Sequence, residues 1–354
     1  MAKFYKLRVA DVRRETADCV SVAFEVPETI KSEYQFIQGQ YLTLKLFVNG
    51  EELRRSYSIC TSPLENELRV AVKRVKDGKG SNFINDNLKT GDEMEVMTPM
   101  GGFHTPLSTF NRKNYVLFAG GSGITPMASI IKTVLQAEPN STVQLFYGNL
   151  DEQSTIFREQ LDRLASNNPS RFRLMYILDK PASALPELQR GIITEQKAGE
   201  LIRAEVDLGK DNEFFICGPT PMMDNVRKVL ESLHVDKKRI HIEYFSSVNA
   251  AGPGTAPVGE RVVARVTILQ YGTETSFELA SDGKSILDAA IEHGVDAPFA
   301  CKGAVCATCR GKVLEGKVRM EKNFALTDSE VADGFILTCQ SHPASESVKV
   351  DYDA

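Results

Sequence analysis

The sequence has no long apolar segment. No run approaches the roughly 18 consecutive apolar residues that a membrane-spanning helix needs. The first residues, MAKFYKLRV, contain no apolar core of the kind found in secretory signals. We therefore expect a cytoplasmic protein that has no membrane partner.

The sequence also has no excess of basic residues, because 42 Lys and Arg stand against 47 Asp and Glu. With no basic stripe, nucleic acid is not an expected partner. The net charge of −5 lies entirely in residues 262–354, which hold 9 basic and 14 acidic residues, whereas residues 1–261 hold 33 of each. This acidic segment predicts docking onto a basic surface of another protein.

Cysteine is scarce outside one short segment. The chain has seven cysteines, an odd number that does not suit a secreted disulfide framework. Cys301, Cys306 and Cys309 fall within nine positions, and Cys339 follows in ILTCQ. The C-x4-C-x2-C spacing with a later fourth cysteine is typical of plant-type [2Fe–2S] ferredoxins. The sequence therefore predicts four cluster ligands at these positions.

A structural zinc site is the alternative for these cysteines. Zinc usually recruits paired C-x2-C knuckles or Cys/His mixtures, and only one knuckle is present here. A Rieske centre is excluded because His293 and His342 are not spaced as its two histidine ligands. Cys19 and Cys60 lie in strand-like runs and are expected to be core residues.

The pattern of the chain predicts three domains and a linker. Residues 1–108 contain six β-rich runs between turn signals and one late helix, which favours an antiparallel β-barrel or sandwich. Residues 109–246 alternate strands with helices, including helices at 152–165 and near 194–205, and predict a doubly wound parallel α/β domain. Residues 247–261 are rich in Ala, Gly and Pro and predict a linker. Residues 262–354 begin with two strands and a helix and contain the cysteine segment.

Two segments of the first domain carry residues suited to a phosphate-bearing aromatic cofactor. Arg55-Ser56-Tyr57-Ser58, on a predicted strand, offers a cation for a diphosphate, a flat ring and a hydroxyl. Lys73 ends a later strand, and the start of the late helix offers N–H groups to an anion. An ordinary N-cap serine would also explain that helix start. The residues expected there are Gly80, Ser81 and Asn82.

The second domain carries glycine-rich turns at strand ends, where doubly wound sheets bind ligands. One turn lies between an apolar strand and a helix, so that its glycines and the helix N–H groups face a pyrophosphate. Another, Cys217-Gly218-Pro219, ends a later strand of the same sheet. Glu243 and Phe245 close the domain. The residues of the first turn are Gly120, Gly121, Ser122, Gly123 and Thr125.

Taken in this order, the motifs resemble those of the ferredoxin–NADP reductase superfamily. The resemblance implies that FAD binds the barrel through Arg55–Ser58, Lys73 and Gly80–Asn82, with Phe245 against the other face of the flavin. It implies that NADPH or NADH binds at the glycine turn and at Cys217–Pro219. It also implies an α+β β-grasp fold for the ferredoxin domain. The catalytic residues that it suggests are Ser58, Cys217 and Glu243.

The domain order, with the ferredoxin last, is similar to that of oxygenase reductases. Stretches such as GEELRRSYSIC and FFICGPTPMMD resemble the reductase subunits of phenylacetyl-CoA epoxidases, which serve phenylacetate catabolism. The 3-ketosteroid 9α-hydroxylase reductases have the same layout and are the alternative. The resemblance implies electron transfer from NAD(P)H through FAD and the cluster to a multicomponent oxygenase. Ala304, Val305 and Ala307 are expected to line the face where electrons leave.

The choice between NADPH and NADH is less directly indicated. Leu150 stands where similar proteins often carry an arginine, but Ser154 and Arg158 on the next predicted helix remain available for a 2′-phosphate. We therefore expect NADPH to be favoured. A redox sensor is a competing class, although a sensor has no need of a nucleotide sheet, and a zinc-stabilised scaffold is a third.

Overall fold

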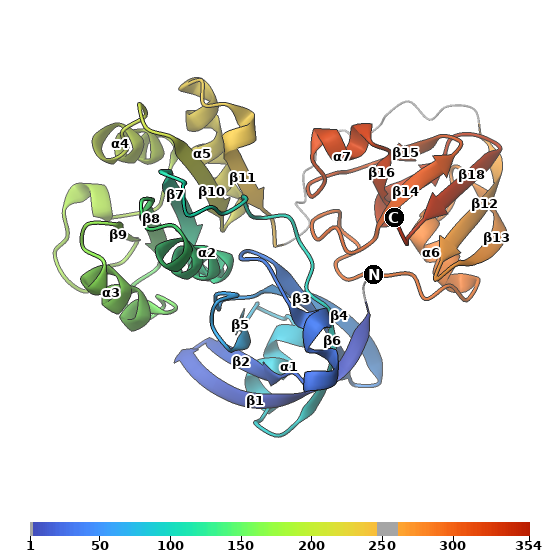
Figure 1. The fold of residues 1–354 in the computed structure, drawn as a ribbon, viewed down its shortest axis with the longest axis horizontal. Coiled ribbons are helices and arrows are strands. Elements are labelled where there is room, and N and C mark those ends of the chain that lie inside the picture. The colour runs from blue at the N-terminus through green and yellow to red at the C-terminus, as the bar shows by residue number, and fades with distance from the viewer. Residues whose placement is uncertain (1–2, 246–260) are drawn as a thin grey trace. The chain divides into compact units, whose positions relative to one another are not determined.

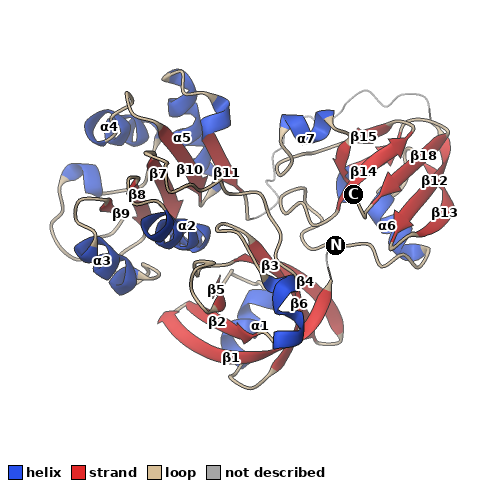
Figure 2. Cartoon of the chain, in the orientation of Figure 1, coloured by secondary structure: helices blue, strands red, loops and turns tan. Residues whose placement is uncertain are grey.

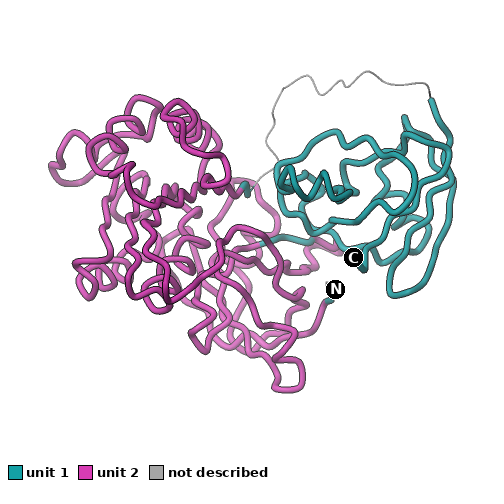
Figure 3. The backbone as a smooth tube through the Cα atoms, turned by 45° about the horizontal axis from the view of Figure 1, so that its top comes forward, with its two compact units in different colours: residues 1–3, 54–56, 244–354 teal, residues 4–53, 57–243 magenta. Residues whose placement is uncertain are grey.

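A computed structural model describes residues 3–245 and 261–354 (Figures 1 and 2). Two compact units are distinguished in Figure 3. One comprises Phe4–Leu53 and Tyr57–Glu243; the other comprises Met1–Lys3, Arg54–Ser56 and Tyr244–Ala354. Apart from Arg261, the predicted linker 247–261 lies outside the described residues. Within the two described ranges, no helix is both long enough and apolar enough to cross a membrane.

The N-terminal strands form the predicted antiparallel barrel. The six strands are hydrogen-bonded in the order β4-β3-β6-β1-β2-β5. A bridge between Ile59 and Val70 joins the end of β4 to β5 and closes the sheet on itself. Inward-facing aliphatic side chains such as Leu42 and Val96 are fully buried. The elements are β1 (Phe4–Thr16), β2 (Cys19–Glu25), β3 (Tyr41–Val48), β4 (Glu51–Ser58), β5 (Leu68–Lys73), α1 (Lys79–Asn87) and β6 (Glu93–Met97).

The next domain is the predicted doubly wound sheet. Its five strands are parallel and lie in the order β11-β10-β7-β8-β9. Helices α2 and α3 lie on one face and α4 and α5 on the other (Figure 1), which explains why the central strands are almost wholly apolar. The elements are β7 (Asn114–Gly120), α2 (Ile124–Ala137), β8 (Thr142–Asn149), α3 (Arg158–Asn167), β9 (Phe172–Leu178), α4 (Glu195–Glu205), β10 (Asn212–Cys217), α5 (Thr220–Ser232) and β11 (Ile240–Glu243).

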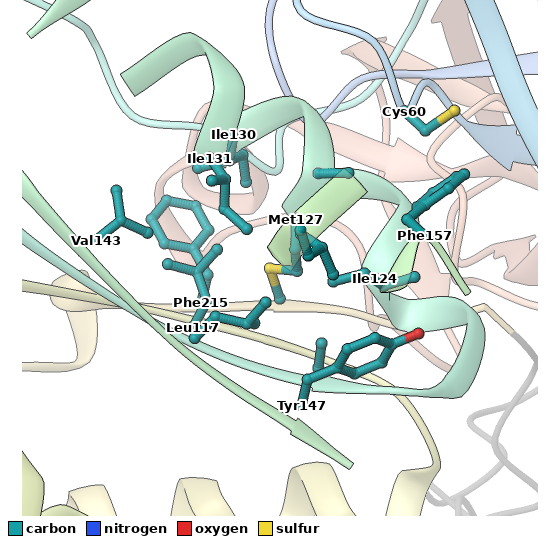
Figure 4. Packing of buried hydrophobic residues seen from close by; sticks show 14 of the residues in the cluster. Cys60, Leu117, Ile124, Met127, Ile130, Ile131, Val143, Tyr147, Phe157 and Phe215 are labelled. Atoms are coloured by element: carbon teal, nitrogen blue, oxygen red, sulfur yellow. The ribbon is translucent and has the colours of Figure 1, made fainter. Parts of the chain in front are cut away.

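The predicted helix at 152–165 is wrong at its start, because α3 begins at Arg158. The carbonyl of Asp151 accepts hydrogen bonds from the hydroxyls of Ser154 and Thr155, which form a turn instead of a helix. Phe157 then adopts a left-handed conformation with φ 61°. Its buried ring packs into the core (Figure 4), and this packing outweighs the local helical preference.

Helix α2 joins the nucleotide domain to the barrel. Figure 4 shows its apolar side chains, including Met127 and Ile130, within the core cluster that also contains Cys60 of the barrel. Three polar side chains of α2 bond to the loop that follows β4: Ser129 Oγ to Thr61 O (2.6 Å), Lys132 Nζ to Cys60 O (3.2 Å) and Thr133 Oγ1 to Ser62 Oγ (2.9 Å). Cys19 and Cys60 are buried, as predicted for core residues.

The C-terminal domain has a mixed sheet in the order β13-β12-β18-β14-β16. A central parallel pair, β12 with β18, is flanked by antiparallel pairs, and α6 packs against the sheet, as in a β-grasp. The cysteine loop connects α6 to β14. The elements are β12 (Val263–Gln270), β13 (Thr273–Ala280), α6 (Ile286–Glu292), β14 (Arg310–Glu315), β15 (Val318–Met320), α7 (Asp328–Ala332), β16 (Phe335–Leu337), η5 (Thr338–Gln340), β17 (Ser341–Pro343) and β18 (Ser347–Asp351).

Candidate functional site

The two predicted nucleotide segments lie against each other at the carboxyl ends of β7 and β10. A Cβ atom on Gly123 would lie 2.1 Å from the carbonyl oxygen of Cys217, and one on Gly218 would lie 2.8 Å from the nitrogen of Gly120. A Cβ on Gly120 would meet Pro219 Cδ at 2.6 Å. Only glycine permits such close backbone approach. The site therefore begins as two interlocked turns at the edge of the sheet where doubly wound folds bind nucleotides.

The first turn presents backbone donors. Gly121 has φ +52° and opens a 3-10 turn, Gly121–Gly123, which leads directly into α2. The N–H of Ile124 bonds to Gly121 O and Ser122 O, and no side chain caps the start of the turn among the described residues, so the N–H groups at the start of this turn are the candidates for an anion. The turn is held from behind by Tyr147, whose hydroxyl donates to Gly121 O (2.9 Å), and by Thr125, whose hydroxyl donates to Ser122 O (3.0 Å). Nearby, at the end of β8, both amide atoms of Asn149 are buried with no hydrogen-bond partner in the described structure. The uncapped start of the Gly121–Gly123 turn and the unpartnered amide of Asn149 fit a dinucleotide.

The three predicted catalytic residues meet at this same edge. Cys217 and Glu243 are paired on neighbouring parallel strands, β10 and β11. Ser58, the last residue of β4, donates from Oγ to Glu243 Oε2 at 3.0 Å. Cys217 and Ser58 are both buried. The fold therefore brings a hydroxyl from the barrel to a carboxyl and a thiol from the nucleotide domain.

Burial dominates the ionisation of this group of residues. Glu243 is partly buried, and the resulting desolvation of its carboxyl raises its pKa to about 8, while the hydrogen bond from Ser58 opposes that rise only in part. Burial, followed by the nearby Glu243 charge, raises the pKa of the Cys217 thiol well above its usual value. At neutral pH the glutamic acid therefore holds a proton, and the cysteine remains a thiol.

The predicted flavin residues of the barrel are distributed along β4 and at the end of β5. The period of two along β4 places Arg55 and Tyr57 on one face of the strand and Ser56 and Ser58 on the other. Arg55 is exposed, and its Nη1 donates to the carbonyl of Arg54. The contacts of Arg55, Ser56, Tyr57 and Ser58 with a flavin stay a prediction.

Lys73 lies next to the nucleotide turn. Its Nζ is 3.5 Å from Asp18 Oδ2, and a Cβ on Gly121 would lie 4.0 Å from the same nitrogen. The predicted diphosphate ligand of the barrel therefore also borders the first glycine turn.

Helix α1 begins at Lys79, directly before the predicted Gly80-Ser81-Asn82 segment. No side chain caps its N-terminus within the described chain. The hydroxyl of Ser81 accepts from Val75 N (3.1 Å) and donates to Gly78 O (3.3 Å), so it stabilises the turn before the helix. Gly80 is buried, and Phe245 is 44% exposed. Backbone N–H groups are therefore better candidates than the Ser81 hydroxyl for holding an anion here.

The four predicted cluster ligands are close together in the C-terminal domain. Hydrogen bonding pairs the thiol of Cys301 with that of Cys306, and the thiol of Cys309 with that of Cys339. Gly303 N also donates to Cys301 Sγ at 3.2 Å. The loop turns back on itself through three non-glycine residues in the left-handed conformation, Lys302 (φ 49°), Ala304 (φ 66°) and Ala307 (φ 53°).

This arrangement fits a [2Fe–2S] cluster. Within each pair one thiol donates to the other, so the pKa of the two acceptors, Cys301 and Cys339, is lowered and that of the two donors, Cys306 and Cys309, is raised. No three His, Cys, Asp or Glu side chains in residues 3–245 and 261–354 surround one point suited to a single metal ion. Two thiol pairs suit a two-iron cluster with four cysteine ligands. Of the expected exit lining, Ala304 and Val305 are buried, and only Ala307 is partly exposed.

The sequence analysis missed the contact between α2 and the loop after β4. Ser129, Lys132 and Thr133 are spaced i, i+3 and i+4 in an otherwise apolar helix, which places them on one face. That polar stripe was a visible signal. Its partners are backbone and side-chain atoms of an irregular loop, which the sequence pattern does not locate.

Comparison with known families agrees with the three domains. Residues 6–105 match the Oxidoreductase FAD-binding domain, residues 117–228 the Oxidoreductase NAD-binding domain, and residues 268–344 the 2Fe-2S iron-sulfur cluster binding domain. The domain boundaries at 108, 246 and 261 themselves stay a prediction.

Full-length relatives share this order of domains. The chain is 41% identical to one subunit of the 1,2-phenylacetyl-CoA epoxidase of Escherichia coli (strain K12), over 100% of this chain and 99% of the relative. It is 32% identical to the 3-ketosteroid-9-alpha-monooxygenase ferredoxin reductase component of Rhodococcus rhodochrous, over 98% and 96%. Among solved structures, phthalate dioxygenase reductase aligns with a TM-score of 0.58 and 25% identity over 98% of each chain. The chain therefore belongs to the family of NAD(P)H-dependent flavin and iron–sulfur oxidoreductases, with FAD, a [2Fe–2S] cluster and NAD(P)H as its cofactors.

Proposed function

We propose that this chain is the reductase component of a multicomponent oxygenase, most specifically of an epoxidase that acts on the ring of phenylacetyl-CoA. The observation that carries the proposal is the 41% identity to a component of such an epoxidase over the whole chain, ferredoxin domain included. A reductase must match its oxygenase at the electron-exit domain, so similarity there bears directly on the partner. The free thiols of all seven cysteines suit a reducing, cytoplasmic setting.

The predicted site residues would serve three tasks. Arg55, Lys73 and the N-terminus of α1 would hold the flavin diphosphate, and the rings of Tyr57 and Phe245 would pack on its faces. The interlocked turns would hold the pyrophosphate and the nicotinamide of NAD(P)H. Bound FAD would accept two electrons from NAD(P)H and release them singly to the cluster. The cluster ligands are Cys301, Cys306, Cys309 and Cys339.

Ser58 and Glu243 would position the nicotinamide and manage a proton beside the flavin. The carboxyl is protonated below about pH 8 because it is withdrawn from water. Ser58 donates its only hydroxyl proton to Glu243. A neutral acid can supply its proton, and the carboxylate that remains would keep the hydrogen bond from Ser58. Cys217, a neutral thiol beside them, would contribute shape and polarity.

One experiment tests the internal route of the electrons. Cys306→Ser is expected to remove the visible absorption of the cluster and to abolish reduction of cytochrome c, while NAD(P)H oxidation with ferricyanide continues at the flavin. Cys60→Ala, which alters a buried cysteine in the core cluster between the barrel and α2, serves as the control and should retain both activities. Unchanged cytochrome c reduction in the variant that lacks the cluster would contradict the proposed order of transfer.

A second experiment tests the partner. The purified chain would be combined with the oxygenase subunits of a phenylacetyl-CoA epoxidase or with those of a 3-ketosteroid 9α-monooxygenase, and NAD(P)H-dependent product formation measured. The second oxygenase is included because a reductase component of that system is 32% identical over nearly the whole chain. Product formation with the steroid system alone would reject the phenylacetyl-CoA assignment and retain the reductase. If the chain did not oxidise NAD(P)H with any artificial acceptor, the reductase function itself would be rejected, and a redox sensor would remain as the alternative.

A further inference from the structure

Two predicted cluster ligands, Cys309 and Cys339, lie where the neighbouring strands β14 and β16 end their pairing. β14 begins directly after Cys309, and β16 ends two residues before Cys339. The last antiparallel pair of the two strands is Arg310 with Leu337. Beyond it, the N–H and the hydroxyl of Thr338 both donate to Cys309 O, at 3.1 and 2.9 Å. Because Thr338 directly precedes Cys339, it links the backbones of the two cysteines.

The last strand of the sheet brings a tyrosine to this link. Val348 and Val350 of β18 are fully buried, and the period of two along a strand places Tyr352 on the same side. The N–H of Tyr352 donates to Leu269 O at 2.9 Å, which extends the pairing of β18 with β12. The ring packs against the core of the domain. The tyrosine therefore enters the domain from a fixed backbone.

The hydroxyls of Tyr352 and Thr338 form a directed chain. Tyr352 Oη donates to Thr338 Oγ1 at 2.7 Å, and Thr338 Oγ1 donates onward to Cys309 O. The positive ends of both O–H dipoles therefore point toward Cys309. Tyr352 is partly buried, and the resulting desolvation raises the pKa of its hydroxyl, to which the nearby Cys309 and Cys339 add. The hydroxyl thus remains a donor at neutral pH.

The C-terminal segment is held in place by other bonds. The carboxylate of Asp353 accepts from Tyr271 N at 2.9 Å and from Gly272 N at 3.0 Å, at the turn between β12 and β13. The backbone of Tyr352 is itself bonded to β12. The segment therefore has anchors besides the bond from Tyr352 to Thr338, and the specific effect of that bond falls on the cysteines.

We propose that Tyr352 is a positioning residue of the cluster site, which acts through the Thr338 hydroxyl to hold Cys309 and Cys339 in place and to favour the reduced cluster. Reduction adds one negative charge, and O–H dipoles whose positive ends point toward a ligand stabilise that charge. Hydrogen bonding around the ligands is one of the factors that set the potential of such clusters. This inference rests on the proposed ligand role of the four cysteines, and Tyr352 itself does not bind iron.

The test uses the full chain, loaded with FAD and reconstituted with iron and sulfide. Tyr352→Phe keeps the ring and removes only the hydroxyl. The midpoint potential of the cluster, followed by electron paramagnetic resonance during a redox titration, should become more negative. In the presence of a chelator, the visible absorption of the cluster should be lost about tenfold faster, which is the usual scale for groups that support metal ligands.

Variants of Thr338 and a control identify the route of the effect. Thr338→Val should change both measurements in the same direction, whereas Thr338→Ser retains a hydroxyl and should resemble the unmodified protein. Adding Tyr352→Phe to Thr338→Val should change nothing further, because Tyr352 acts through that hydroxyl. Thr267→Val removes an exposed hydroxyl of the same sheet, bonded to Ser276, and should leave both measurements unchanged.

Several results would overturn the proposal. A lower Tm of Tyr352→Phe with an unchanged potential would indicate a merely structural role. Additive effects in the double variant would exclude action through Thr338. If Tyr352→Phe did not fold, equal potentials in Thr338→Val and Thr338→Ser would decide against the chain of hydroxyls. An unmodified protein that took up no cluster would instead overturn the assignment of the cysteine ligands.

Discussion

Ser58 Oγ lies 3.0 Å from Glu243 Oε2, although 185 positions separate the two residues in the chain. The bond joins the last residue of a barrel strand to the last residue of a strand in the nucleotide sheet. It depends on how α2 packs on the loop after β4, because that loop begins directly after Ser58. The geometry of the proposed reaction site is thus set by the packing of two domains.

Glu243→Gln should change how the rate of flavin reduction depends on pH. With a pKa of about 8, the native carboxyl loses its proton on the alkaline side of neutrality. The rate of flavin reduction by NAD(P)H, followed by stopped flow, should therefore change near that pH. In the glutamine variant this transition should disappear. A transition of the same size in both proteins would exclude Glu243 as the titrating group.

The same carboxyl should affect stability in a predictable direction. Between its usual value of 4.5 and about 8, the native state keeps a proton that the unfolded chain has lost, so the stability of the unmodified protein falls as pH rises. Glu243→Gln has no such group. The difference in Tm, variant minus unmodified, should grow across this window and stay constant above it. A difference that is independent of pH would contradict the raised pKa.

Gly123→Ala should disrupt the interlocked turns. The new Cβ would lie 2.1 Å from the carbonyl oxygen of Cys217, so one of the two turns must move. We expect a loss of roughly 1–3 kcal/mol in the free energy of unfolding, as for other overpacked positions, together with weaker NADH binding. Gly102→Ala is the matched control, since nothing lies within 4 Å of its Cβ position. Urea unfolding measures the loss of stability, and the dependence of flavin reduction on the nucleotide concentration measures the weaker binding.

Lys132→Met should weaken the contact between α2 and the barrel. Lys132 is buried and bonds to both Cys60 O and Glu65 Oε2. Its loss leaves a buried carbonyl without a partner and should cost about 1–3 kcal/mol. Lys31→Met, which breaks an exposed ion pair with Glu28, should change stability by less than about 1 kcal/mol. Similar losses in the two variants would argue against a special role for Lys132.

Cys19, Cys60 and Cys217 should resist alkylation in the folded protein. Burial raises the pKa of Cys60 to about 12 and also raises those of Cys19 and Cys217 well above their usual value. Because the thiolate is the reactive species, iodoacetamide should modify these residues only after unfolding. Mass spectrometry of peptides from native and urea-treated protein distinguishes the two states. Rapid labelling of Cys217 in the native protein would contradict its burial.

The sequence predicted those features of the fold that depend on the local pattern of residues. Alternating apolar residues indicated the barrel strands, and the buried runs indicated the parallel sheet. Glycines at strand ends indicated the turns, because only glycine tolerates the close approach seen at Gly123. The Cys301–Cys309 spacing predicted a loop whose thiols indeed lie together with that of Cys339.

The features that the sequence analysis missed depend on contacts in three dimensions. The start of α3 is displaced because Phe157 is drawn into the core, which no local propensity reveals. The bonds between the Ser154 hydroxyl and the backbone of Asp151 form in a turn that the sequence analysis took for the start of a helix, and the suggested role of Ser154 at a 2′-phosphate stays a prediction. The raised pKa of Glu243 follows from burial, which the sequence does not show. Each case depends on contacts that form only in the folded chain.

The left-handed residues of the cysteine loop have a consequence for biogenesis. Lys302, Ala304 and Ala307 each adopt a backbone conformation that costs roughly 1–2 kcal/mol for an L-residue. Bonds from iron to the predicted cysteine ligands would offset this cost, and a newly made chain that has not received iron lacks them. Its loop should open and become the preferred cleavage point for cellular proteases. The fold would thereby let the cell remove copies without a cluster before they compete for the oxygenase.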